Sequence, residues 1–419
     1  LNQIKVLALF DLVESTSLTP GVREVIQAAA ADNEEREVET PKLPFMTLIK
    51  DQHEELQSNV RCIVEYVAKG TFGEVYRAYY PLAQREEAVK VVRLVNRQGL
   101  PLDDAERIER LRSQLDEAEI MLELGLHPNL VAIRGVLMLR AMQDANSEAV
   151  ADNLYVFMDY VEGGMTLAGC VENLDMDLET KVHLGMDMAQ GLKHIRQCFP
   201  NYKHTHWDHK PENVLVECSR DNDNGEWIPQ RAKIGDFGVA MTFAYASPET
   251  THRGLGSELA AKTQHQWSWA TTFMAMLLGG CTWIEHTEAV RVLQREVESA
   301  SQVGDDDGGL FLSCLRLCER CMHEDPELRC SMGDVVAELS RLLGDVDDTR
   351  LSDERDGMEL WRLHTEIGRI LLQEMIKTSE DYARVEAHFY AATQLAVEIE
   401  GEDSSFFAGS LNNLALLLE

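Results

Sequence analysis

A stretch of eight residues, 206–213, constrains this chain more than any other part of its sequence, and it reads His-Trp-Asp-His-Lys-Pro-Glu-Asn. It places a carboxylate at Asp208, an ammonium group at Lys210 and an amide at Asn213. A base, a cation that faces phosphate groups and an amide that ligates a metal ion are what phosphoryl transfer to a hydroxyl requires in one place. The spacing therefore predicts a catalytic loop for phosphoryl transfer.

A second motif follows downstream, where residues 234–238 read Ile-Gly-Asp-Phe-Gly. The apolar residues that lead into it predict a short strand over 232–234. Asp236 follows this strand within the Asp-Phe-Gly triplet. The alternative to a functional motif is an ordinary turn, and the position of the triplet after the catalytic loop argues against a turn alone.

Upstream, residues 67–76 contain two glycines, Gly70 and Gly73, in a segment that predicts a phosphate-binding lid. Glycine lets the backbone approach a phosphate group because it has no Cβ in the way. Alternating residues over 62–66 and 75–79 predict a strand on each side of the glycines, as in a hairpin.

A lysine and a carboxylate come next. Residues 87–92 alternate as a strand and contain Lys90, which the surrounding apolar residues predict to be buried. A buried lysine needs a carboxylate as its partner. Residues 105–124 predict an amphipathic helix that offers Glu117, with Glu119 as the alternative.

An apolar run over 154–161 predicts a buried strand that ends in the glycine turn of residues 162–164. In this order, the motifs resemble those of the eukaryotic protein kinase domain, whose catalytic loop is written H-R-D-x-K-x-x-N and whose metal loop is D-F-G. The resemblance covers roughly residues 59–345. It implies an α+β, two-lobed fold with a strand-rich amino lobe up to about residue 160 and a helical carboxy lobe.

The same resemblance implies the chemistry. ATP and Mg²⁺ would be the cofactors, and the substrate would be a serine or threonine hydroxyl of a protein, because Lys210 matches serine/threonine rather than tyrosine kinases. Asp208 would be the base and Lys210 would act beside it, while Asn213 and Asp236 would ligate Mg²⁺. The residues implied in ATP binding are Ala68, Gly70, Gly73, Val75, Lys90, Glu117, Met158, Asp159 and Val161.

Within that set, Ala68 occupies the position of the first glycine of the family pattern. Lys90 would hold the α- and β-phosphates with Glu117 as its ion-pair partner, and Met158 would guard the back of the adenine pocket. Main-chain groups of Asp159 and Val161 would bind adenine.

The resemblance extends to two later motifs. Residues 247–249, Ser-Pro-Glu, replace the family's Ala-Pro-Glu, and residues 325–329 end in the arginine that pairs with this glutamate. A buried Glu249–Arg329 pair is therefore expected. Breaking such a pair is strongly destabilising because one charge is left buried alone.

Three departures from the family pattern bear on activity. Trp207 replaces the arginine that binds an activation-loop phosphate in many kinases, so the chain is of the non-RD type. His265 stands where the family has an aspartate that anchors the catalytic-loop backbone, and only residues 239–246 separate Gly238 from Ser247. Two interpretations follow, an active serine/threonine kinase or a pseudokinase scaffold that binds nucleotide weakly or not at all. The intact catalytic set favours the first.

The composition of the chain limits the classes of binding partner and the cellular compartment that we expect. The net charge of −33 argues against nucleic acid and against anionic membrane surfaces. Nine cysteines scattered along a long chain indicate a reducing compartment, and we expect a cytoplasmic location. Four of them cluster over 314–330, at a spacing that makes a metal site improbable. We also expect no membrane segment in this chain, since no apolar run reaches 18 residues.

The domain organisation is expected to have four parts. Residues 1–58 carry no motif that we can name and end in an acidic linker, and 59–345 form the kinase-like domain. A second acidic linker covers 346–357, and 358–419 form an all-α tail.

Helices are expected in the tail over 360–375, 382–400 and 408–419, with small residues at packing points. This resembles incomplete tetratricopeptide repeats of the kinesin-light-chain type, which implies a protein partner that binds through the helical repeats. The alternative is a helical hairpin packed on the kinase. An incomplete array should expose the leucines of the last helix, 414 and 416–418.

Overall fold

The computed structural model describes residues 62–69, 73–80, 84–96, 101–139, 153–201, 204–221, 225–238, 242–253, 257–281, 283–302, 308–344, 357–375, 378–401 and 404–418. The expected amino-terminal segment 1–58, nearly all of the linker 346–357 and Gly70 lie outside these ranges. The chain divides into two compact units, and each is described by itself.

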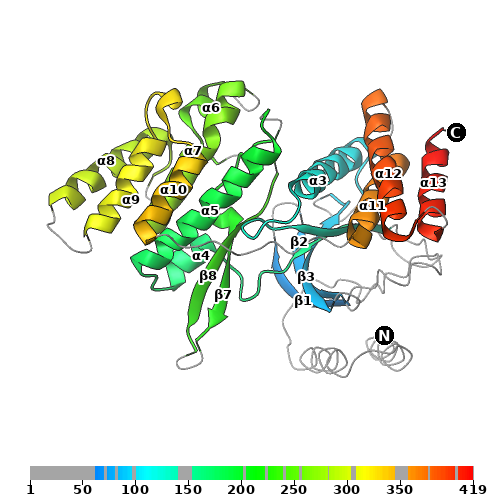
Figure 1. The fold of residues 1–419 in the computed structure, drawn as a ribbon, viewed down its shortest axis with the longest axis horizontal. Helices are drawn as coiled ribbons and strands as arrows, with labels where there is room; N and C mark the ends of the chain where they lie inside the picture. The colour runs from blue at the N-terminus through cyan, green and yellow to red at the C-terminus, as the bar shows by residue number, and fades with distance from the viewer. Residues whose placement is uncertain are drawn as a thin grey trace. The chain divides into compact units, whose positions relative to one another are not determined.

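The first unit is built around a five-stranded sheet and also includes residues 362–388 of the tail (Figure 1). The strand order is β1-β2-β3-β5-β4. The bounds are β1 Cys62–Lys69, β2 Glu74–Tyr80, β3 Arg85–Arg93, β4 Ile133–Leu139 and β5 Asn153–Asp159. This confirms the strands expected on both sides of the glycines, around Lys90 and over 154–161.

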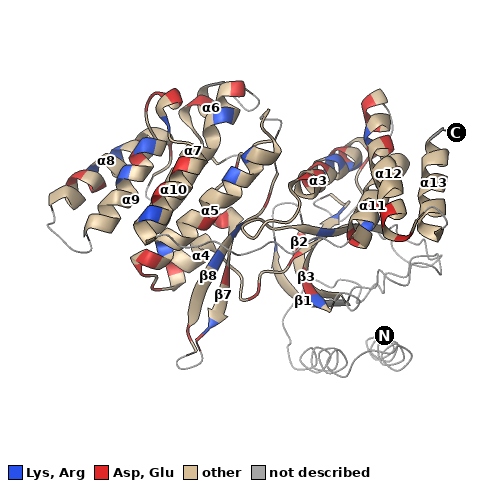
Figure 2. Ribbon diagram, in the orientation of Figure 1, with Lys and Arg blue, Asp and Glu red and all other residues tan. Residues whose placement is uncertain are grey.

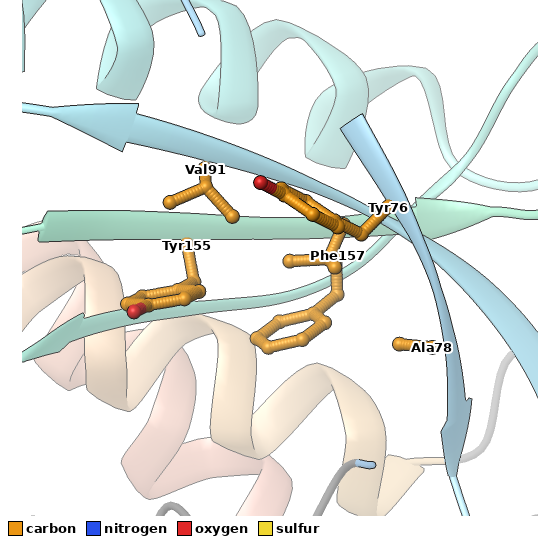
Figure 3. Packing of buried hydrophobic residues seen from close by; sticks show 6 residues of the cluster. Tyr76, Ala78, Val91, Tyr155 and Phe157 are labelled. Carbon is orange, nitrogen blue, oxygen red and sulfur yellow. The ribbon is translucent and has the colours of Figure 1, made fainter. Parts of the chain in front are cut away.

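The two faces of this sheet differ. Cross-strand pairing places Tyr76 opposite Val89 and Val89 opposite Phe157, so these three residues share one face. This face carries a buried apolar cluster made of Tyr76, Ala78, Val89, Val91, Tyr155 and Phe157, most of which is labelled in Figure 3. Because successive side chains of a strand point to opposite sides, Lys90 lies on the other face.

The helix expected over 105–124 is confirmed as α3 (Asp104–Leu124). Asp103 caps its start, where Oδ1 accepts the backbone N–H of Glu106 at 2.8 Å. Leu111, Leu115 and other apolar residues at helical spacing are buried. The helix therefore forms because one stripe is apolar and its first turn is capped.

The second unit is mainly helical. Besides most of α3 and the end of the tail, it contains α4 Leu167–Asn173, α5 Leu178–Cys198, α6 Pro248–Arg253, α7 Glu258–Leu277, α8 His286–Gln302, α9 Gly308–Cys321 and α10 Met332–Leu343. Its core contains Trp267, Trp269 and Phe273, all on α7. Trp269 also donates its indole N–H to the Gly185 carbonyl at 2.9 Å, which joins α7 to α5.

A three-stranded sheet with the order β6-β7-β8 carries the loops of the candidate site. Its strands are β6 Met165–Thr166, β7 Val214–Arg220 and β8 Trp227–Ile234. β8 is longer than the strand expected over 232–234, because it already begins at Trp227. The strands pair as far as Arg220 and Trp227, and Gly225 (φ +73°) lies in the turn.

The tail forms three helices, α11 (Gly357–Glu374), α12 (Ser379–Glu400) and α13 (Ser405–Leu418), close to the expected bounds. Trp361 joins α11 to α13, since its indole N–H donates to the Ser410 hydroxyl at 2.8 Å. Leu416 and Leu411 are 50% and 43% exposed, whereas Leu414 and Leu417 are half-buried. The exposure expected of the last helix is thus confirmed at position 416 but not at 414 or 417, and the repeat interpretation stays a prediction.

Among the described residues, no helix combines the length and the apolar character that a membrane crossing requires.

Candidate active site

The structure brings the three polar residues of the catalytic loop together. The Lys210 ammonium donates to Asp208 Oδ2 at 2.6 Å. The Asn213 amide donates to the Asp208 carbonyl at 2.8 Å and to Oδ2 at 3.1 Å. Asn213 ends the short 3-10 helix η2 (Pro211–Asn213), and β7 begins at the next residue. The turn of η2 therefore returns the amide to the carboxylate that precedes it.

Asp208 is a buried, ionised carboxylate. Burial alone would raise its pKa, but the hydrogen bond from Lys210 and the nearby Thr242 hydroxyl hold the pKa below its usual value. The second carboxylate oxygen, Oδ1, is also buried and accepts no hydrogen bond from the residues that the structure describes.

Thr242 is a fourth polar residue beside Asp208, Lys210 and Asn213. It lies between Gly238 and Ser247, in the part of the chain that corresponds to the activation segment of kinases. The Lys210 ammonium donates to the Thr242 hydroxyl at 2.8 Å, in addition to its bond with Asp208. Lys210 therefore connects Thr242 to the Asp208 carboxylate. Thr242 immediately precedes the 3-10 helix η3 (Phe243–Tyr245), so the same contact fixes the start of η3.

His265 anchors the catalytic loop. Its Nε2 accepts the backbone N–H of His206 at 3.1 Å. Burial, together with the charge of Arg196, lowers the pKa of His265 well below its usual value, so the ring is neutral and Nε2 can accept. A neutral imidazole thus makes the backbone contact that the resemblance assigns to an aspartate at this position.

The metal loop is tied to the catalytic loop by its backbone. The Gly235 N–H donates to the Asn213 carbonyl at 2.9 Å, and His206 Nε2 lies 3.0 Å from the Gly235 carbonyl. The next residue, Asp236, has a φ of +56°, a left-handed conformation that is uncommon for a residue with a Cβ. Its side chain is exposed, whereas Phe237 is buried, and the ring centroids of Phe237 and His206 are 5.2 Å apart.

This geometry fits a divalent cation held by Asp236 and Asn213. The left-handed backbone keeps the Asp236 carboxylate exposed while Phe237 is buried. The side-chain NH₂ group of Asn213 donates to Asp208, which leaves the side-chain oxygen of Asn213, Oδ1, as the ligand atom. Oxygen ligands of this kind suit Mg²⁺, which is held by few protein groups together with substrate phosphates. Among the described residues, no group of three or more His, Cys, Asp or Glu side chains is placed to hold a metal ion.

In the first unit, four of the predicted ATP-binding residues, Ala68, Val75, Lys90 and Met158, share one face of the sheet. Lys90 pairs with Val75 on β2 and with Val156 on β5, and Met158 lies on the same face of β5. Lys90 and Met158 are half-buried. Ala68 lies near the end of β1, opposite Val75.

Gly73 has a packing role that the sequence did not indicate. A Cβ at this position would lie 2.3 Å from the Val91 carbonyl oxygen, so any larger residue would push β2 away from β3. Glu117 lies on α3, half-buried. Its expected pairing with Lys90 stays a prediction.

The segment expected to bind adenine contains two residues with other contacts. The Asp159 carboxylate accepts a hydrogen bond from Arg134 Nε at 2.6 Å. Val161 is buried, and its carbonyl accepts the Gly164 N–H at 2.9 Å in the glycine turn. The role of these main-chain groups in adenine binding stays a prediction.

The Glu249–Arg329 ion pair is confirmed. The Arg329 guanidinium donates to both Glu249 oxygens, at 2.9 and 3.0 Å, and its side chain is fully buried. It also lies over the Trp267 ring, 5.0 Å from the ring centroid. The pair joins α6, which ends the activation segment, to the segment before α10.

Two buried polar residues of the site were missed. Gln264 accepts the Ser247 N–H at 3.0 Å and donates to the carbonyls of Trp207 and Tyr245, so it connects the catalytic loop to the activation segment. Asp187 accepts the Ala232 N–H at 2.9 Å and supports β8 just before the metal loop. In the sequence, a charged residue between two methionines of α5 could have indicated that Asp187 is buried, whereas no local pattern singled out Gln264.

The comparisons with known proteins agree with this geometry. A family model of the protein kinase domain matches residues 63–339. L-type lectin-domain containing receptor kinase IV.3 of Arabidopsis thaliana is 25% identical over 303 residues, which are 66% of this chain and 40% of that protein. L-type lectin-domain containing receptor kinase V.7 of the same plant is 28% identical over 201 residues, 46% of this chain and 25% of that protein.

MAP kinase kinase kinase SSK2 of Saccharomyces cerevisiae is 29% identical over 181 residues, which are 43% of this chain and 9% of that protein. The chain thus spans less than half the length of each of these relatives. The family model, in contrast, covers well over half of the 419 residues and includes the catalytic loop, the metal loop and the Glu249–Arg329 pair. The chain therefore belongs to the protein kinase domain family.

Proposed function

We propose that the chain is an active serine/threonine protein kinase that uses ATP and Mg²⁺. One observation carries this proposal. Lys210 joins the Asp208 carboxylate, at 2.6 Å, to the Thr242 hydroxyl, at 2.8 Å, and leaves Asp208 Oδ1 without a hydrogen-bond partner in the described part of the chain. A base with one free oxygen, beside a cation, is the arrangement that accepts a hydroxyl proton during phosphoryl transfer.

Each residue has a distinct task in this mechanism. Asp208 Oδ1 accepts the proton of the substrate hydroxyl, and Lys210 stabilises negative charge on the transferred group. Asn213 and Asp236 would hold Mg²⁺, which supplies charge neutralisation at the phosphates. Lys90 would contact the phosphates from the sheet, with Glu117 as its partner.

The choice of a serine or threonine substrate rests on Lys210, which resembles the serine/threonine pattern, and the named relatives are protein kinases. Acidic side chains are distributed over the helices (Figure 2), and the chain has a net charge of −33. A protein of this charge attracts basic partners. A generic basic protein is therefore the appropriate first substrate.

The test is transfer of labelled γ-phosphate from ATP to a basic protein in the presence of Mg²⁺, with phosphoamino-acid analysis of the product. Lys90→Met and Asp236→Asn should each abolish transfer while the melting temperature stays near that of the wild type. Both residues act on the charges of ATP and Mg²⁺ rather than on packing, and Asp236 is exposed. Undiminished transfer in both variants would reject the kinase assignment.

The pseudokinase interpretation was based on His265 and on the short activation segment. The observed bond from the His206 N–H to His265 Nε2 removes the first of these reasons, because the loop is anchored despite the substitution. The active kinase is therefore the function that we propose.

Regulation should not depend on phosphorylation of the activation segment. Trp207 replaces the arginine that would bind such a phosphate, and Thr242 is already engaged by Lys210. We expect phosphatase treatment to leave the rate unchanged and Thr242→Ala to lower kcat about tenfold through lost positioning of Lys210, within the usual range for a coupled contact. Thr242→Ser, which keeps the hydroxyl, is the matched control. Inactivation by phosphatase together with rescue by Thr242→Glu would contradict this account.

We further propose that the tail binds a protein partner through its helices and that the chain works in the cytoplasm, with no nucleic acid partner. The exposed aromatic residues Tyr382 and Tyr390 lie on α12 and give the tail a contact surface. Eight cysteines, from Cys170 to Cys330, are free thiols, which is compatible with a reducing compartment.

A further inference from the structure

The apolar face of the five-stranded sheet is the face that does not carry Lys90. Its members are at most 5% exposed although they lie on the surface of a single sheet, so another element must cover them. The family model ends at residue 339, whereas the unit that contains this sheet also includes residues 362–388. The tail thus places most of α11 and part of α12 in the same unit as this sheet.

Helix α11 meets this face at the end of β2. The Arg362 guanidinium donates to the Tyr80 hydroxyl at 2.7 Å. Tyr80 follows Tyr76 and Ala78 at every second position, so it belongs to the apolar face, and it is 5% exposed. In Figure 3, Tyr155 and Phe157 point toward a helix drawn in the faint orange of the carboxy-terminal segment.

The side chains of α11 fit this position. Four of its apolar residues recur at helical spacing and are almost completely buried, namely Leu363, Ile367, Ile370 and Leu371. Arg362, which contacts Tyr80, lies in the first half of the helix, and Glu374 is its last residue. The two points are about 18 Å apart along the helix axis.

At its carboxy-terminal end, α11 reaches α3. The Arg107 guanidinium pairs with the Glu374 carboxylate at 2.5 Å. The Glu374 side chain is 4% exposed and that of Arg107 is 21% exposed, so water screens this pair far less than a surface pair. Arg107 belongs to the first turn of α3.

The residues just before α3 are also connected to the residues just after β3. The Leu102 N–H donates to the Leu94 carbonyl at 3.2 Å, and Val95 and Pro101 form an isolated bridge. Glu117 follows Arg107 on the same helix, about 15 Å further along. A shift or rotation of the first turn would therefore change the position of the residue that is expected to pair with Lys90.

We propose that α11 is a positioning element of the kinase domain: it covers the sheet face opposite Lys90, and its Glu374 holds Arg107 so that α3 stays in the arrangement required for phosphoryl transfer. Arg107 and Glu374 are thus positioning residues that act through α3 and touch neither ATP nor substrate. The effect on transfer rests on the proposed kinase function, whereas the effect on α3 does not.

The test compares full-length wild type with Glu374→Gln, Arg107→Gln, the double variant and the exchanged pair Arg107→Glu with Glu374→Arg. Each single change should lower kcat about tenfold and leave the KM for the protein substrate unchanged. The double variant should be no slower than the single ones, and the exchanged pair should recover to within about threefold of wild type. Amide hydrogen exchange of residues 104–124 should rise in the single variants and return in the exchanged pair.

Arg369→Gln is the matched control, because Arg369 pairs with Glu366 within α11 at 3.0 Å and its loss removes an ion pair from the same helix. This variant should keep the wild-type kcat and the wild-type exchange of α3. Equal loss in the control, additive loss in the double variant, or unchanged exchange of α3 would overturn the proposal. If wild type transfers no phosphate, the proposed kinase function fails, and the exchange of α3 still decides whether Glu374 fixes that helix.

Discussion

Replacement of Asp208 by asparagine is expected to lower kcat by about 10²–10⁴-fold, the usual contribution of a positioned general base. The amide keeps the shape of the side chain but cannot accept the proton. Its NH₂ group would also face Lys210, which donates to Asp208 Oδ2 at 2.6 Å in the wild type. ATP affinity should change little, because the free oxygen of Asp208 is the one assigned to the substrate hydroxyl.

Rapid-quench turnover and equilibrium binding of a fluorescent ATP analogue measure the two quantities separately. Asp177→Asn is a suitable control, since Asp177 caps α5 by accepting the Thr180 N–H and asparagine caps helices equally well. A large loss of ATP affinity in Asp208→Asn, with turnover preserved, would show that Asp208 faces the nucleotide and not the hydroxyl.

The second large effect concerns stability. Arg329→Ala should lower the free energy of unfolding by about 3–5 kcal/mol, because it leaves the Glu249 carboxylate buried without its bidentate partner. Burial alone would raise the pKa of Glu249, but Arg329 holds it below the usual value. The stabilisation is therefore present above the pKa of the unfolded chain, about 4.3, and is lost as the pH falls through the lower folded-state pKa.

Urea unfolding of the second unit measures this effect. Lys262→Ala is the matched control, since Lys262 pairs with Glu327 at 2.8 Å but the two side chains are 43% and 61% exposed. Removal of an exposed pair should change the free energy of unfolding by less than about 1 kcal/mol. Equal effects of the two substitutions would mean that burial does not govern the strength of the Glu249–Arg329 pair.

Local patterns predicted the elements that carry the site. The helix expected over 105–124 is observed as α3 with almost the same bounds. The strand around Lys90 and the strand before Asp236 were likewise found, because alternation and apolar runs are properties of a few consecutive residues. The catalytic loop was predictable for the same reason, since its three polar residues lie within one short segment.

The contacts that could not be predicted join residues far apart in the chain. Gln264 reaches Trp207 and Tyr245, which are 57 and 19 positions away, and no local pattern distinguishes it from a surface glutamine. The requirement for glycine at position 73 comes from the Val91 carbonyl on the neighbouring strand. The tail was expected as a separate array, whereas residues 362–388 group with the five-stranded sheet.

The first unit combines segments that are far apart in the chain, and this has a consequence for its synthesis on the ribosome. Tyr80 and Arg362 are 282 positions apart, yet they form one hydrogen bond. At about 5–20 residues per second, roughly 15–60 s pass between the emergence of these two residues. If α11 covers the sheet as we propose, the nascent chain carries an uncovered apolar sheet face throughout this interval. Such a surface favours aggregation and chaperone binding, so the yield of folded protein should depend on translation speed between residues 80 and 362.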